Sequence, residues 1–219
     1  MSETSTRVTD RHFEYIAART RRDDSFLGEL KRAALAAGIR AIWIAPEQAS
    51  LMQILLRAAG AREVIEVGTL AGYSAIQMAR ALPPAADGGR VRTIELEPKH
   101  VQFARAWIAK SDVKDKVIVI EGRGADVLPT FANDSADAAF LDADKKSYPL
   151  YLEQALRIVK KGGLVLVDNA FAFGQLFEEK PSDGEARAVQ EFNEIMAREE
   201  RLQSVIVPIG DGLWVGVKL

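Results

Sequence analysis

The sequence predicts an α/β fold with a doubly wound, seven-stranded, mostly parallel sheet that ends in an antiparallel hairpin. Short apolar runs alternate with amphipathic segments between residues 46 and 169, which is typical of strands that are buried on both faces by helices. The stretch I-G-D-G lies between two later apolar runs and indicates the hairpin. A length of 219 residues with 48% hydrophobic residues fits one domain with a sizeable core.

The predicted elements follow one another without a long linker or an internal repeat. Residues 1–45 are interpreted as an N-terminal helical cover, with helices at 11–18 and 24–37 that lie over the site or form a dimer contact. Residues 46–219 form the predicted α/β core. The expected strands of the core are 63–67, 91–95, 117–121, 138–141, 164–167, 202–208 and 213–217. The expected helices are 46–59, one that ends at 82, 98–110, 126–131, 148–159 and 185–201, with a loop at 170–184.

Composition narrows the class of protein. The formal net charge is −2 and there is no long basic tract, which disfavours nucleic acid as the main partner. The absence of cysteine excludes disulfides and thiolate metal sites. The polar start lacks the apolar core of a signal peptide, and no apolar run approaches the ~20 residues of a membrane span. We therefore expect a cytoplasmic protein without a membrane partner.

Two acids and one amide follow the ends of neighbouring apolar runs. Asp142 follows the run 138–141, and Asp168 and Asn169 follow the run 164–167. A helical segment separates the runs, so a right-handed crossover places the two strands side by side. The three side chains then converge at the carboxyl ends of the strands, where open α/β sheets bind ligands. This set of oxygen ligands suits a hard divalent cation such as Mg²⁺, or alternatively Mn²⁺ or Ca²⁺.

The first strand of the core leads into the turn G-T-L-A-G-Y-S. Gly68 and Gly72 permit close approach of a ligand to the backbone, and Ser74 can cap the next helix. Glu66 would attract an ammonium group, and Glu95 ends the second strand, where such folds bind a ribose. S-adenosylmethionine (SAM), a ribonucleoside with an ammonium group and no phosphate, fits both acids. The alternative is a generic glycine turn beside two surface acids.

Five ordered motifs resemble those of the cation-dependent O-methyltransferases. The motifs are I-E-V-G-T-L-A-G-Y-S, T-I-E-L-E-P, F-L-D-A-D-K, G-G-L-V-L-V-D-N and P-I-G-D-G-L. The family includes catechol and caffeoyl-CoA O-methyltransferases and many small bacterial relatives, and the resemblance runs from about residue 39 to residue 219. It implies a class I methyltransferase fold of the Rossmann-like type and a homodimer.

The resemblance also assigns roles to individual residues. Asp142, Asp168 and Asn169 match the metal ligands of the family, and Lys145 matches its general base. The positions that match cofactor contacts are Glu66, Gly68 and Ser74 near the methionine part, Glu95 at the ribose, and Gly124 and Ala125 at the adenine. Beside these positions, we expect Gly72 of the glycine turn and Asp142 to belong to the same cofactor site.

These residues suggest a reaction. A small aromatic molecule with adjacent hydroxyls can chelate the cation, which lowers the pKa of the bound hydroxyl. Lys145, three residues after Asp142, would take the phenolic proton. The resulting oxyanion would attack the sulfonium methyl group in line. The sequence therefore predicts an O-methyltransferase that depends on SAM and a divalent cation.

Other functions stay open. A tRNA hydroxyuridine methyltransferase would need a basic surface, which 29 Lys and Arg against 31 Asp and Glu do not indicate. A nicotinamide-dependent oxidoreductase would need a G-x-G-x-x-G turn, which is absent here. A non-catalytic sensor of an adenosyl ligand would not need the catalytic set.

The segment after Asn169 reads D-N-A-F-A-F-G, where plant caffeoyl-CoA enzymes resemble D-N-T-L-W-N-G. Ala172 and Phe173 replace a Trp and an Asn that face the substrate there, which disfavours a CoA ester. Phe171, Phe173 and Phe177 either build an apolar wall for an aromatic substrate or pack the loop down.

Overall fold

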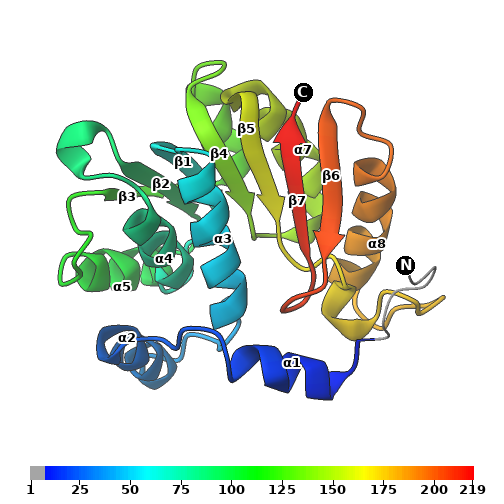
Figure 1. Ribbon diagram of the computed structural model, residues 1–219, viewed down its shortest axis with the longest axis horizontal. Coiled ribbons are helices and arrows are strands. Elements are labelled where there is room, and N and C mark those ends of the chain that lie inside the picture. Colours follow the sequence, from blue (N-terminus) through cyan, green and yellow to red (C-terminus); the bar gives the residue numbers. More distant parts are fainter. Residues whose placement is uncertain (1–7) are drawn as a thin grey trace.

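The computed structural model describes residues 8–219 and contains one seven-stranded sheet (Figure 1). The strands are β1 (Glu63–Val67), β2 (Arg90–Glu95), β3 (Val117–Glu121), β4 (Ala136–Leu141), β5 (Val159–Val167), β6 (Leu202–Val207) and β7 (Leu213–Lys218). Their order across the sheet is β3-β2-β1-β4-β5-β7-β6. Strands β1 to β5 are parallel, and β7 pairs antiparallel with both β5 and β6. The predicted doubly wound sheet with its C-terminal hairpin is therefore confirmed.

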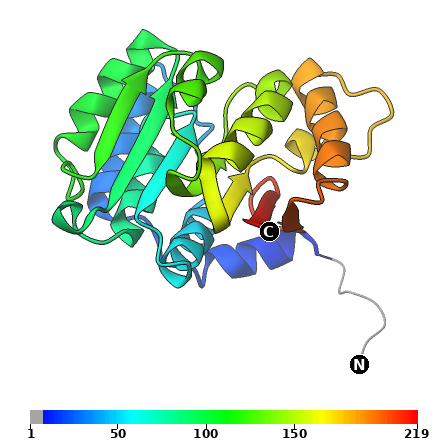
Figure 2. The same cartoon turned by 90° about the horizontal axis from the view of Figure 1, so that it is seen from above.

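Helices cover both faces of the sheet, as the turned view shows (Figure 2). They are α1 (Asp10–Ala17), α2 (Ser25–Ala36), α3 (Pro46–Ala58), α4 (Tyr73–Ala81), α5 (Pro98–Ile108), α6 (Gly124–Val127), α7 (Tyr148–Ile158) and α8 (Gly184–Met196). One hydrophobic core lies between one face of the sheet and the helices α2, α3, α4 and α5. A second core lies between the other face and the helices α7 and α8. In β4 and β5, alternate residues supply the two cores, because successive side chains point to opposite faces.

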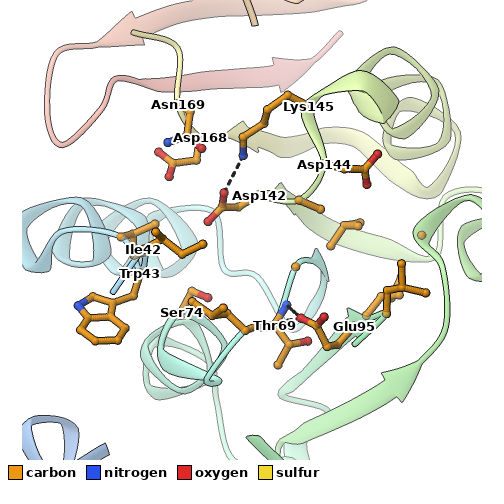
Figure 3. A pocket seen from close by; sticks show the side chains of 18 of the residues that line it. Ile42, Trp43, Thr69, Ser74, Glu95, Asp142, Asp144, Lys145, Asp168 and Asn169 are labelled. Atoms are coloured by element: carbon orange, nitrogen blue, oxygen red, sulfur yellow. Dashed lines mark hydrogen bonds and ion pairs between the residues drawn. The ribbon is translucent and has the colours of Figure 1, made fainter. Parts of the chain in front are cut away.

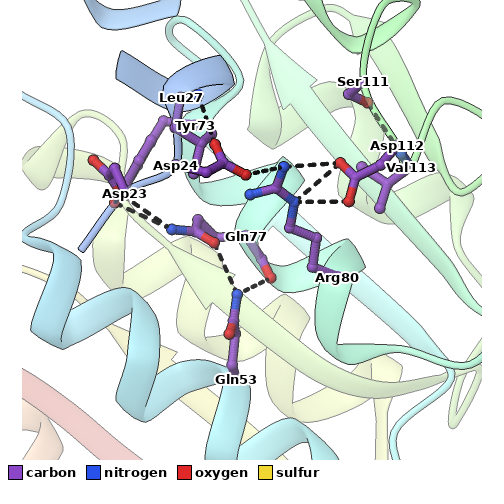
Figure 4. A network of polar contacts seen from close by, with 10 residues as sticks. All are labelled: Asp23, Asp24, Leu27, Gln53, Tyr73, Gln77, Arg80, Ser111, Asp112 and Val113. Atoms are coloured by element: carbon purple, nitrogen blue, oxygen red, sulfur yellow. Dashed lines mark hydrogen bonds and ion pairs between the residues drawn. The ribbon is translucent and has the colours of Figure 1, made fainter. Parts of the chain in front are cut away.

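A polar network fastens the N-terminal segment to α4 (Figure 4). Asp24 accepts the backbone N–H of Leu27 and caps α2, and its carboxylate also lies 2.9 Å from the guanidinium of Arg80. The hydroxyl of Tyr73 donates to Asp23 at 2.7 Å. Helix α2 therefore shares contacts with the core, whereas α1 buries no side chain. In Figure 1 both helices lie below the carboxyl ends of the parallel strands.

Several element boundaries differ from the prediction, and the largest differences lie at α6, at the start of β5 and at the end of α8, which stops at Met196 and not at residue 201. Strand β5 begins at Val159, directly after α7, and the pairing of Ala136 with Val159 is followed by a shift of register. The sequence K-K-G-G that follows Val159 lacks a strand pattern, so the sequence predicts only the apolar second half of β5, residues 164–167. Helix α6 is a single turn that begins at Gly124, and a 3₁₀ turn over Leu128–Thr130 continues it.

The register of the central strands aligns the residues that follow them. Val67 pairs with Leu141, and Leu141 pairs with Val167. The residues just beyond these pairs therefore meet at one edge of the sheet, beside the crevice between β1 and β4 where the connections turn to opposite faces. No helix within residues 8–219 is long and apolar enough to cross a membrane.

Candidate active site

A cavity of about 1050 Å³ opens at the carboxyl ends of the parallel strands. This volume accommodates a ligand of drug size or larger. Among the predicted site residues, those that line the cavity are Gly68, Ser74, Glu95, Gly124, Ala125, Asp142, Lys145, Asp168 and Asn169. Most of the predicted set is thus brought together, and Figure 3 shows its acids and Lys145 around one space.

Backbone hydrogen bonds place two of the three candidate metal ligands, and the third follows directly in the chain. The N–H of Asp142 donates to the carbonyl of Val67 at 2.9 Å, and the N–H of Asp168 donates to the carbonyl of Leu141 at 3.0 Å. These bonds extend the parallel pairing by one residue past each strand. Asn169 then leaves the strand in a left-handed conformation with φ of 66°, which Asn tolerates better than most residues.

Asp168 carries the strongest electrostatic perturbation in this cluster. Burial, together with repulsion from Asp142, raises the pKa of Asp168 to about 7. The buried side chain of Gln48, from the first turn of α3, donates a hydrogen bond to the Asp168 carboxylate. Two carboxylates therefore face the same cavity and repel each other, and a bound cation would relieve this repulsion.

Lys145 is held beside Asp142 by polar contacts. Its ammonium group lies 3.0 Å from Asp142 Oδ1 and donates to the hydroxyl of Tyr148 at 2.7 Å. Only 5% of the residue is exposed. Lys145 begins a 3₁₀ turn, Lys145–Ser147, that leads into α7. The ammonium group of Lys145 is therefore withdrawn from solvent and paired with a carboxylate inside the cavity.

The glycine turn after β1 approaches β4 closely. A Cβ at Gly68 would collide with the carbonyl oxygen of Asp142, and φ of Gly68 is 103°, so this position requires glycine. Glu95 organises the same turn, because its Oε2 accepts the N–H groups of Thr69 at 3.1 Å and Leu70 at 2.8 Å. Its side chain also lies 3.5 Å from His100, which lines the cavity as well.

Glu66 and Gly72 lie behind the cavity wall. Glu66 is fully buried, accepts a hydrogen bond from Ser74 and has a second oxygen without a partner among the described residues. Burial raises the pKa of Glu66 to about 8. Gly72 faces Ile108 and is itself the N-cap of α4 with φ of 87°. The predicted capping role of Ser74 is therefore wrong, because this serine lies inside the helix and bonds to Glu66.

The remaining walls come from three segments. Gly124 and Ala125 line the cavity at the start of α6, and a Cβ at Gly124 would press on Tyr151 at 2.8 Å. Trp43 lines it from the connector before α3. Of the three loop phenylalanines, only Phe173 lines the cavity, and Phe177 is 93% exposed. An apolar wall built by all three is therefore excluded.

Sequence reasoning missed Gln48 and Tyr148 and interpreted Asp211 as a simple turn residue. Gln48 is 120 residues away from the acid that it contacts, so no local spacing links the two. Asp211 accepts the amide N–H of Asn169 at 3.1 Å from the turn between β6 and β7. Tyr148 lies three residues after Lys145, and this helical spacing is the sequence feature that could have indicated their contact.

The candidate ligands fit a hard cation by their chemistry. Asp142, Asp168 and Asn169 offer carboxylate and amide oxygens, which suit Mg²⁺ and similar ions. Within residues 8–219 no group of three or more His, Cys, Asp or Glu side chains could hold a metal ion. Any site here therefore depends on the amide of Asn169 as the third protein ligand.

Comparisons with known proteins agree with the fold. Residues 17–219 match the O-methyltransferase family. A catechol O-methyltransferase of Niastella koreensis is 34% identical over 199 residues, which cover 90% of this chain and 86% of the relative. A catechol O-methyltransferase of Mycobacterium tuberculosis is 34% identical over 198 residues, which cover 90% and 88%. The structure of an O-methyltransferase of Bacillus cereus in complex with SAH superposes with a TM-score of 0.84 at 31% identity, covering 95% of this chain and 97% of that one.

Proposed function

Because the chain belongs to the O-methyltransferase family and is a SAM-dependent O-methyltransferase, we propose that it methylates one hydroxyl of an aromatic vicinal diol with the help of a divalent cation. The observation that carries the proposal is the convergence of Asp142, Asp168, Asn169 and Lys145 in one cavity. Two relatives that are named catechol O-methyltransferases support the choice of a small aromatic diol.

In this proposal the chain's own residues hold and orient the reactants. Asp142, Asp168 and Asn169 would hold the cation, which supplies Lewis-acid polarisation of the substrate hydroxyl when bound. Lys145 Nζ, held between Asp142 and Tyr148, would accept the phenolic proton once its own proton has left. The phenolate oxygen forms a bond to the methyl carbon as the carbon–sulfur bond breaks, and the thioether departs without charge.

The cofactor would occupy the other end of the cavity. Gly68 lets a ligand approach the turn after β1, and Glu95, at the end of β2, is the acid proposed to bind the ribose. Because opposite charges are neutralised in the transfer, alignment of the two reactants should supply much of the rate. Trp43 and Phe173, which both line the cavity, are suited to enclose an aromatic substrate.

The test is transfer of a labelled methyl group from SAM to catechol, caffeate, caffeoyl-CoA and a simple monophenol. Each reaction is run with Mg²⁺, with a chelator, and with Mg²⁺ restored in excess after chelation. We expect methylation of the diols alone, its loss with the chelator and its recovery with Mg²⁺. Equal methylation of the monophenol, or full activity in the chelator, would refute cation-assisted catalysis. Binding of SAM measured by calorimetry with the chelator controls for damage to the cofactor site.

A further inference from the structure

The turn between β6 and β7 reaches across the end of β5. Within this turn, Asp211 Oδ2 accepts two hydrogen bonds, from Asn169 Nδ2 at 3.1 Å and from the backbone N–H of Phe173 at 3.0 Å. One carboxylate oxygen therefore contacts both a candidate metal ligand and a residue of the substrate wall. All three residues line the same cavity.

The first hydrogen bond determines which end of the Asn169 amide is free. A carboxylate accepts hydrogen bonds and cannot donate them, so Asp211 can only be paired with the amide nitrogen. The amide oxygen then points away from Asp211 and stays available to a cation. Since a hard cation binds oxygen and not the amide nitrogen, the orientation that Asp211 selects is the orientation that a ligand needs.

The second hydrogen bond supports a loop of unusual backbone conformation. Asn169, Ala172 and Phe173 have φ of 66°, 53° and 57°, which side chains other than glycine rarely adopt. Such conformations persist only where the surroundings hold them. The backbone of the turn adds further support, because the N–H of Ala170 donates to Gly212 at 2.9 Å and that of Phe171 donates to Asp211 at 2.8 Å.

We propose that Asp211 is a positioning residue, which orients the Asn169 amide oxygen towards the cation and holds Phe173 in the substrate wall. The inference rests on the proposed function, because it assigns Asn169 to the cation. Outer residues that orient metal ligands commonly change metal affinity by about 10–100-fold when they are removed. Because the Asp211 carboxylate contacts both the Asn169 amide and the backbone of Phe173, the position of the substrate wall is coupled to that of the metal ligand.

The test uses the full chain and Mn²⁺ as the probe, with free Mn²⁺ followed by electron paramagnetic resonance without any turnover. Asp211→Ala should weaken Mn²⁺ binding by about 10–100-fold and leave the affinity for SAM within about twofold of wild type. Asp211→Asn keeps an oxygen that accepts both hydrogen bonds and should recover most of the Mn²⁺ affinity. Asp87→Ala, a change of an exposed turn acid far from the cavity, is the matched control and should bind Mn²⁺ like wild type.

Three results would overturn the inference. They are wild-type Mn²⁺ affinity in Asp211→Ala, equal weakness of Asp211→Asn and Asp211→Ala, and a parallel loss of SAM affinity in both Asp211 variants. The last of these would mean that the residue serves the fold alone. Failure of the wild-type protein to bind Mn²⁺ at all would instead refute the cation-dependent function, together with the inference that rests on it.

Discussion

Glutamine in place of Glu66 should stabilise the folded protein progressively as the pH rises. Burial raises the pKa of this carboxyl from 4.5 to about 8 in the folded state. Below pH 4.5 the group is protonated in the folded and unfolded states, so it has no effect on stability. Between pH 4.5 and 8 the unfolded chain releases the proton that the folded protein retains, and each further pH unit therefore favours unfolding. Above pH 8 the penalty has reached its full size.

The size of the effect follows from the two pKa values. One pH unit corresponds to about 1.4 kcal/mol, so a rise from 4.5 to about 8 amounts to roughly 5 kcal/mol at most. Glutamine has the shape of the protonated acid and can still accept the hydrogen bond from Ser74. The variant should consequently match wild type near pH 4.5 and exceed its free energy of unfolding by several kcal/mol at pH 8.5.

Urea unfolding followed by circular dichroism at pH 5, 6, 7 and 8.5 measures this difference. Other groups also titrate in this range, so the decisive quantity is the variant minus wild type at each pH. The control is Glu121→Gln, a change at a half-exposed carboxylate at the end of β3, which should leave the pH dependence of wild type unchanged. A Glu66→Gln difference that stays constant from pH 5 to pH 8.5 would refute the reasoning.

Three further predictions concern the cavity. Asp168→Ala should abolish cation-dependent turnover while SAM still binds in calorimetry; an equal loss of SAM affinity would assign the residue to the fold or the cofactor. Lys145→Ala should lower kcat by about 10²–10⁴-fold with a much smaller change in KM, and steady-state kinetics that show an unchanged kcat would remove the proton-transfer role. Gly68→Ala should destabilise the protein by about 3 kcal/mol, because the new methyl group meets the Asp142 carbonyl and φ is positive. Thermal unfolding checks this last prediction, and a melting temperature equal to that of wild type would contradict it.

The part of the site that follows strand ends could be predicted from the sequence. Asp142 and Asp168 each come one residue after a buried parallel strand, and parallel pairing necessarily brings such residues to one edge. Gly68 was predictable for the same reason, since the turn after the first strand faces the neighbouring strand end. The fold class depended on the same alternation and was predicted correctly.

The contacts that orient these residues could not be predicted. Gln48 and Asp211 reach the ligands from segments that are remote in sequence, and their partners depend on how α3 and the hairpin pack. Glu66 was expected to contact the cofactor, yet it does not line the cavity, whereas Ser74, which donates a hydrogen bond to it, does. The homodimer and the cytoplasmic location stay predictions.

The sheet order has a consequence for biosynthesis. Strand β7 follows β6 in sequence but lies inside the sheet, between β5 and β6. During translation, β5 therefore remains an uncovered edge until residues 213–218 have left the ribosome, and exposed edges invite wrong pairing. The turn that carries Asp211 docks in the same event. A nascent chain that already contains every proposed cation ligand would thus be unable to orient Asn169, and would acquire an organised site only as the hairpin closes.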